Sequence, residues 1–180
     1  MQYVAILRGI NVGGHHIVPM SQLIVLLEQK GCVDVKTYIQ SGNVVFRSKQ
    51  KNVGKLEKQL IEAIEQEFGF PVPTLLRTRE ELEEAVVLNP FDVGATDLKL
   101  LHLMFLEREP KPEDLKRLDA CYGGVDQFEV RGRHVYLQYD AGSAKSKLTS
   151  AYFDSRLQMT SSARNWRTVL ALLDLMRMLA

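Results

Sequence analysis

The first residues that could do chemistry form a glycine-rich segment beside an arginine. Arg8 follows an apolar run, and Gly9, Asn11, Gly13 and Gly14 come directly after it. Glycine lets a backbone take positive φ or approach a ligand closely, and an arginine would neutralise a phosphate. The spacing matches neither G-x-G-x-x-G nor G-x-x-x-x-G-K-S/T. The segment predicts a phosphate-binding loop, and a tight exit from a buried strand is the simpler alternative.

Two further basic segments each follow a serine, a residue that favours helix starts. Ser143 precedes Lys145 and Lys147, and a serine pair precedes Arg164 and Arg167. Cations in a first helical turn oppose the helix dipole, whereas free N–H groups, hydroxyls and cations together suit an anion. We expect these residues and the Arg8 loop to bind one anionic ligand jointly. Solvated surface lysines are the alternative for the first of the two segments.

A tight turn, Gln40-Ser41-Gly42-Asn43, offers amide and hydroxyl groups. Gln40 and Asn43 would add specificity for a base or sugar, although simple turn chemistry explains them as well. His15-His16 lack companion ligands at metal-binding spacing, so we expect no metal and no cofactor. No paired nucleophile and base, and no C-x-x-C or G-x-S-x-G motif, is present. The sequence thus predicts binding and leaves open whether a reaction follows.

Composition indicates a cytoplasmic globular protein. The net charge of +1 argues against coating a nucleic acid by bulk electrostatics. Cys32 and Cys121 lie far apart in the chain, which favours reduced thiols. No targeting signal is evident, and the apolar stretch 168–180 is too short to span a membrane. We therefore expect a cytoplasmic location without membrane contact.

The elements that would position the first loop alternate in type. Apolar runs, helical spacing and turn residues predict strand 3–7, helix 19–30, strands 33–40 and 44–47, helix 55–68 and strand 72–78. This is the order of a ferredoxin-like split βαβ arrangement. The unbroken apolar character of 3–7 places that strand in the middle of its sheet. The first subdomain is therefore predicted at 1–78.

The remaining chain repeats the same order after a link at 79–97, where a capping box starts a helix. The pattern predicts strand 98–106, helix 112–121, hairpin 127–131 with 134–139, a helix from about 143, and a C-terminal helix from about 163 in place of a fourth strand. The fold class is thus α+β, with two ferredoxin-like subdomains of βαββα type and a C-terminal helix, the second subdomain at 98–180. Apolar sheet faces need a cover, so we expect a monomer whose halves cover each other or a homodimer.

Several motifs together resemble a bacterial family, the domain of unknown function 1697. They are Leu7-Arg8-Gly9-Ile10-Asn11-Val12-Gly13-Gly14, Thr37-Tyr38-Ile39-Gln40-Ser41-Gly42-Asn43-Val44-Val45-Phe46, Asn89-Pro90-Phe91, Lys145-Ser146-Lys147 and Arg164-Asn165-Trp166-Arg167-Thr168-Val169. The resemblance implies a two-part α+β fold of ferredoxin-like type in a cytosolic bacterial protein. It implies no established activity and no accepted catalytic residues.

The leading functional hypothesis is a site for a phosphorylated small molecule or nucleotide between the two subdomains. The first alternative is RNA or single-stranded nucleic-acid binding, because RNA-recognition modules share this order of elements. Few aromatic residues on the hairpin and the low net charge count against it. The second alternative is a non-catalytic interaction protein.

Overall fold

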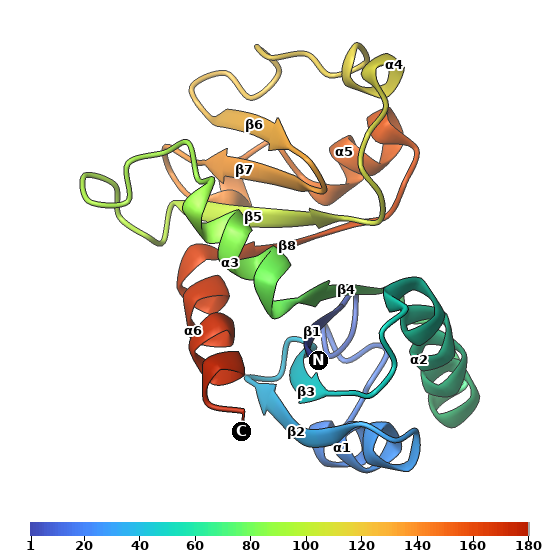
Figure 1. Cartoon of the computed structure of the whole chain (residues 1–180). Coiled ribbons are helices and arrows are strands. Elements are labelled where there is room, and N and C mark those ends of the chain that lie inside the picture. The colour runs from blue at the N-terminus through green and yellow to red at the C-terminus, as the bar shows by residue number, and fades with distance from the viewer. Residues whose placement is uncertain (180) are drawn as a thin grey trace. The chain divides into compact units, whose positions relative to one another are not determined.

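Residues 1–179 are described by the computed structural model, and they form two four-stranded antiparallel sheets with helices (Figure 1). The α+β class expected from the sequence is confirmed. Contacts divide the chain into two units. Unit 1 comprises residues 1–83 with 171–179 of the described part, and unit 2 comprises residues 84–170. The division falls within α3 (Arg79–Val87) and α6 (Trp166–Arg177), so each of these helices contributes residues to both units.

Unit 1 holds a sheet with the strand order β2-β3-β1-β4, all neighbours being antiparallel. Its elements are β1 (Gln2–Leu7), α1 (Met20–Gln29), β2 (Val33–Tyr38), β3 (Asn43–Arg47), α2 (Val53–Phe68) and β4 (Thr74–Thr78). β1 lies between β3 and β4, as its apolar run predicts, because a strand with two neighbours and two covered faces has no polar face.

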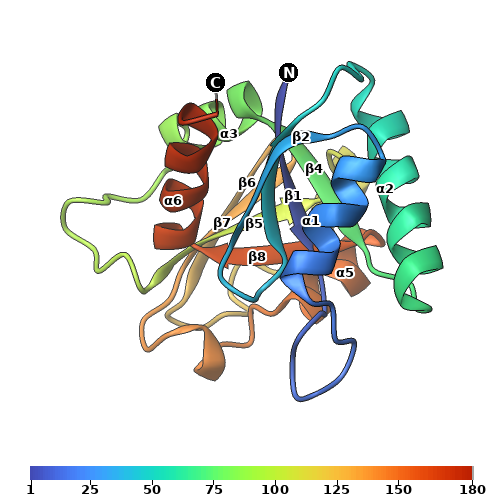
Figure 2. The same ribbon diagram turned by 90° about the horizontal axis from the view of Figure 1, so that it is seen from below.

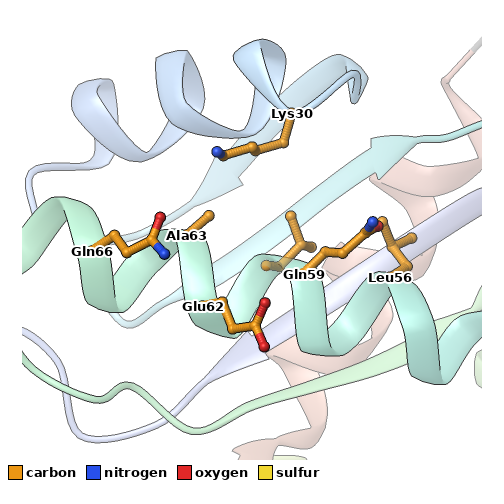
Figure 3. Close-up of a pocket in the computed structure, with 7 residues that line it drawn as sticks. Lys30, Leu56, Gln59, Glu62, Ala63 and Gln66 are labelled. Atoms are coloured by element: carbon orange, nitrogen blue, oxygen red, sulfur yellow. The ribbon is translucent and has the colours of Figure 1, made fainter.

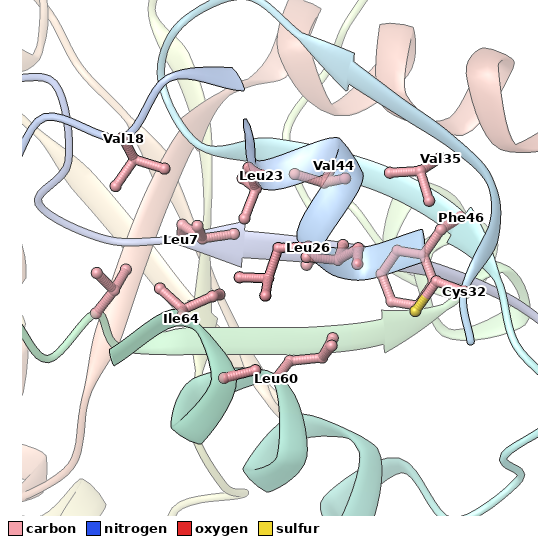
Figure 4. Close-up of a cluster of buried hydrophobic side chains, with 14 of the residues drawn as sticks. Leu7, Val18, Leu23, Leu26, Cys32, Val35, Val44, Phe46, Leu60 and Ile64 are labelled. Carbon is pink, nitrogen blue, oxygen red and sulfur yellow. The ribbon is translucent and has the colours of Figure 1, made fainter. Parts of the chain in front are cut away.

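Two helices cover one face of this sheet and close the core of unit 1. Figure 2 shows α1 and α2 side by side over the strands. Leu7 and Phe46 point from the sheet toward Leu23 of α1 and toward Leu60 and Ile64 of α2 (Figure 4). All five are at most 3% exposed. Burial of each such side chain stabilises the fold by roughly 1.5–3 kcal/mol.

Local signals set the ends of the helices in unit 1. The side chain of Asn52 accepts a hydrogen bond from the N–H of Lys55 at the start of α2, and Gly69, at φ 79°, ends that helix. Thr78 and Glu81 exchange side-chain and backbone hydrogen bonds of 2.8 and 3.2 Å, which confirms the capping box predicted at the start of α3.

Unit 2 holds a sheet with the order β6-β7-β5-β8. Its elements are β5 (Leu101–Leu106), α4 (Pro112–Leu115), β6 (Gln127–Arg131), β7 (His134–Gln138), the 3-10 helix η1 (Ser143–Lys145), α5 (Ser150–Leu157) and β8 (Ser161–Asn165). Met104, Leu137 and Phe153 are fully buried in its core.

Three expectations for unit 2 are wrong. A fourth strand exists: residues 161–165 form β8 along β5, and α6 begins only at Trp166. Pairing with β5 overrides the weak strand propensity of this serine- and arginine-containing segment. The helix expected from Ser143 is the short η1, and α5 starts after Thr149, whose side chain caps it. The helix 112–121 ends at Leu115, which is 39% exposed and does not face the core.

Across the described residues, no helix combines the length and the apolar character that a membrane crossing needs.

Candidate functional site

Three loops of unit 1 open at the edge where β1 ends, and we call them the loop cluster: residues 8–19, 39–42 and 69–73. The sheet register explains why they meet. Leu7, the last residue of β1, pairs with Thr74 at the start of β4, and its neighbour Ile6 pairs with Asn43 at the start of β3. The loop that leaves β1 and the loops that enter β3 and β4 therefore share one end of the sheet.

Direct hydrogen bonds tie the loop cluster together. The N–H of Arg8 donates to the carbonyl of Pro73 at 2.9 Å, and the N–H of Leu7 donates to the carbonyl of Gly42 at 2.8 Å. The turn 39–42 packs so closely on β1 that a Cβ at Gly42 would lie 2.8 Å from the Cβ of Leu7. A glycine is thus required at position 42 for this contact, which the motif alone did not reveal.

Residues 11–16 form a small finger within the first loop. The N–H of Asn11 donates to the carbonyl of His16, and the N–H of His15 donates to the carbonyl of Val12, each at 3.1 Å. Gly13 and Gly14 form the tip at φ 60° and 78°, as in a type I′ turn. Among the described residues the N–H groups of these two glycines have no hydrogen-bond partner. The tip can therefore donate to a ligand.

The two asparagines expected to contact a ligand hold the loops together, and their contact with a ligand stays a prediction. The Asn11 amide donates to the carbonyls of Val18 and Gln40, both at 3.0 Å, and its oxygen accepts from the N–H of Val18. Asn43 is fully buried, and its amide donates to the carbonyl of Tyr38 and to the Ser41 hydroxyl. Both side chains position the loop cluster.

The charge of the loop cluster is one-sided. Its three loops contain Arg8, His15 and His16 and no aspartate or glutamate. Arg8 is half-buried, while both histidines and Gln40 are exposed. The absence of carboxylates was readable from the sequence, since the first acidic residue of the chain is Glu28. The Arg8 guanidinium, together with hydrogen-bond donors and without a carboxylate in these loops, suits an anion.

Backbone strain also gathers in the loop cluster. Of the non-glycine residues that take positive φ in the described chain, Asn11, His16 and Ile39 lie here, at φ 56°, 49° and 50°. Positive φ is most unusual for a β-branched residue such as Ile39. Strained backbone of this kind concentrates at functional sites.

The basic segment of unit 2 has mixed surroundings. Lys145 and Lys147 line a cavity of about 170 Å³ together with Asp126 and Asp140. Ser143 lies in η1, a single three-residue 3-10 turn, so the helix dipole expected there is absent. The two carboxylates offset the two lysines, which makes an anion site less favourable here than in the loop cluster.

The arginines expected at a common helix start are separated by the structure. Arg164 lies in β8, largely buried, and burial lowers the pKa of its guanidinium to about 10. Its Nη1 donates to the Ser162 hydroxyl at 2.8 Å. Arg167 is exposed in α6 and contacts Asp97 at 3.3 Å. The two do not share a helix face, and that all three basic segments bind one ligand stays a prediction.

A fully buried arginine was missed by sequence reasoning. Arg77 in β4 is fully buried, and its Nη1 donates to the carbonyl of Leu76 at 2.7 Å. It pairs with the third residue of β1, as Arg164 pairs with the third residue of β5. Arg164 likewise donates to the carbonyl of its preceding residue, Ala163, at 2.9 Å. The two arginines therefore occupy equivalent positions of the repeat.

Two surface cavities lie on the helix side of unit 1, away from the predicted residues. The larger, about 340 Å³, is formed mainly by α1, and the other, about 240 Å³, lies beside α2 below Lys30 (Figure 3). Amide side chains line both: Gln22 and Gln29 in the first, Gln59 and Gln66 in the second. Neither cavity contains a cluster of titratable groups that points to a reaction.

No group of three or more histidine, cysteine or acidic side chains in the described chain is arranged to hold a metal ion. Cys32 is buried, and burial raises the pKa of its thiol to about 11, whereas Cys121 is exposed. A thiol whose pKa is raised in this way, as that of Cys32 is, lacks the thiolate character that an activated nucleophile requires.

The fold and the loop cluster define an α+β protein with a candidate anion site. The family described as "Protein of unknown function (DUF1697)" matches residues 1–136, more than half of the chain, and the protein belongs to this family. Among curated proteins, no sequence matches it. The conserved bacterial protein SP0830 from Streptococcus pneumoniae has a similar structure, with a TM-score of 0.64 and 23% identity over 97% of this chain and 98% of that one. At this identity the similarity concerns the fold.

Proposed function

We propose that the loop cluster binds the phosphate of a phosphorylated small molecule or a nucleotide. The observation that carries the proposal is that three loops converge on one end of the sheet with an arginine, hydrogen-bond donors and no carboxylate. An anion placed there meets no like charge within these loops, and hydrogen bonds to charged donors are about twice as strong as neutral ones.

Each part of the loop cluster has a distinct role in the proposal. Arg8 neutralises the phosphate, and the N–H groups of Gly13 and Gly14 donate to its oxygens. The exposed amide of Gln40 contacts the rest of the ligand. Asn11 fixes the first loop against the turn that carries Gln40. Binding requires no reaction, and the loop cluster offers no paired nucleophile and base.

We propose further that each unit is a ferredoxin-like βαββαβ module in a cytoplasmic protein. The strand orders β2-β3-β1-β4 and β6-β7-β5-β8 support this, since in both the first strand of the unit lies between its third and fourth. RNA-recognition modules share this order. This shared order makes single-stranded nucleic acid the second candidate ligand.

Calorimetric titration tests the proposal. Inorganic phosphate, ribose 5-phosphate, AMP and a short oligouridylate are titrated into the protein and into Arg8→Gln at low and high salt. Loss of one charge-assisted contact should weaken phosphate binding roughly 10- to 150-fold. Lys51→Gln is the matched control, because Lys51 is exposed beyond β3 at the opposite end of the sheet. It should change affinity by less than about twofold.

The outcomes separate the candidates. Phosphate binding that falls in Arg8→Gln and not in Lys51→Gln supports the loop cluster. Binding of oligouridylate alone, with a steep loss at high salt, favours nucleic acid. No binding by any probe refutes both and leaves an interaction protein. Melting temperatures without ligand confirm that each variant is folded.

A further inference from the structure

His16 and Phe70 form a stacked aromatic pair in the loop cluster. Their ring centroids are 4.6 Å apart and their planes differ by 20°. Phe70 is half-buried against the core of unit 1, and Phe68 lies beside it with ring centroids 6.5 Å apart. His16 is an exposed residue, and Phe70 is the one aromatic ring that stacks on it among the described residues, which leaves the second ring face for a ligand. The pair is a flat surface anchored on one side.

The orientation of the His16 ring is fixed by more than stacking. Its Nδ1 lies 3.3 Å from the carbonyl oxygen of Gly9. A carbonyl only accepts hydrogen bonds, so Nδ1 carries the proton that joins them. The backbone of His16, at φ 49°, is bound to Asn11 across the finger. An exposed ring held by a stack, a hydrogen bond and a backbone bridge loses little conformational freedom when a ligand arrives.

We infer that the ligand of the loop cluster is a nucleotide, whose base stacks on the open face of His16. This inference rests on the proposed phosphate site and deepens it. Gly9, to which His16 is bound, directly follows Arg8, so the stacking surface and the phosphate-binding arginine belong to the same turn of chain. The Gln40 amide offers both a donor and an acceptor for a base edge.

A sugar phosphate would use this surface less than a nucleotide would. A sugar brings only its C–H groups to an aromatic face, whereas every nucleobase has a π-face that stacks on the ring. Base stacking on a protein aromatic ring is worth roughly five- to 150-fold in affinity. The His16 pair thus predicts a preference for AMP over ribose 5-phosphate of roughly five- to 150-fold.

The test compares AMP with ribose 5-phosphate by calorimetric titration in three variants. His16→Ala removes the stacking ring. The AMP affinity should then fall roughly five- to 150-fold, toward that of ribose 5-phosphate, whose own affinity stays nearly constant. Phe70→Leu removes the supporting ring and should lower AMP affinity by a smaller factor. His15→Ala is the matched control, since this neighbouring histidine is exposed and makes no ring contact among the described residues. It should leave the ratio of the two affinities unchanged.

Two results overturn the inference while the proposed phosphate site stands. One is equal affinity of the unaltered protein for AMP and ribose 5-phosphate. The other is an equal loss of both ligands in His16→Ala, which would assign the ring to phosphate binding or to loop structure. If neither compound nor inorganic phosphate binds the unaltered protein, the proposed function fails and the inference fails with it.

Discussion

His102 should make the protein less stable in mild acid. It lies in β5, between β7 and β8, with its ring edge-on to Tyr139 at 5.0 Å between centroids. Its Nδ1 is buried without a hydrogen-bond partner among the described residues. Burial lowers the pKa of this imidazole to about 4. The folded protein therefore keeps His102 neutral at a pH where an exposed histidine is charged.

The magnitude follows from the two pKa values. In the unfolded chain the His102 pKa is about 6.5. As the pH falls below that value, the unfolded chain binds a proton that the folded chain does not, so the free energy of unfolding decreases. Between about pH 8 and pH 5 the decrease from this residue amounts to ~2 kcal/mol. It levels off below about pH 4, where both states are protonated.

Urea unfolding of the protein and of His102→Phe, each followed from pH 8 to pH 5, measures this effect. Trp166, the single tryptophan, is buried in the same unit and reports the transition by fluorescence. The variant has no titrating group at position 102, so its free energy of unfolding should fall by ~2 kcal/mol less over this range. The remaining histidines are common to both proteins, so their contributions cancel when the two pH profiles are subtracted. Parallel pH profiles would refute the assignment of a depressed pKa to His102.

Two further predictions concern glycine and cysteine positions. Gly42→Ala, at φ 73°, places a Cβ 2.8 Å from that of Leu7, and it should lower the free energy of unfolding of unit 1 by roughly 2–5 kcal/mol in urea. Gly69→Ala has a similar φ of 79° but open space around the new Cβ, so it should lower the free energy of unfolding by only about 1–2 kcal/mol. Equal costs would show that the close contact of the turn is unimportant. With Ellman's reagent near neutral pH, exposed Cys121 should react at once and Cys32, buried with its pKa raised to about 11, only as the fold opens. Two equally fast thiols would contradict the burial of Cys32.

The first half of the fold could be predicted because its signals agree with one another. The apolar run of β1, the helical spacing in α2 and the turn before Asn43 each favour the structure that forms. The glycine that ends α2 is found at the left-handed φ that such a position requires. Where local propensity and packing favour the same structure, sequence patterns suffice.

The second half departs from prediction where packing decides against local pattern. Residues 161–165 contain no large apolar side chain, yet they pair with residues 102–106 of β5. Because two serines precede the helical pattern of α6, the sequence resembles a helix start with a serine cap. The residues that do cap are Thr149 for α5, and Asn165, whose Oδ1 accepts from the N–H of Arg167 in α6. Because pairing with β5 determines this strand, the sequence of residues 161–165 shows little strand propensity of its own.

The candidate site could be predicted in part. The Arg8 loop and the turn at Gln40 were recognisable, and the order of elements places both at one end of the sheet. The roles of the asparagines and the stacking of His16 on Phe70 could not be read from the sequence. They depend on contacts between loops that are far apart in the chain.

The most direct test of the phosphate site maps ligand contacts residue by residue. A protein of 20.5 kDa gives resolved amide signals in ¹H–¹⁵N correlation spectra, recorded during titration with inorganic phosphate and then with AMP. The account predicts that the amides of Gly9, Gly13, Gly14 and Gln40 shift most and saturate with one dissociation constant. Shifts confined to the amides around Lys145, or none at saturating ligand, would contradict it.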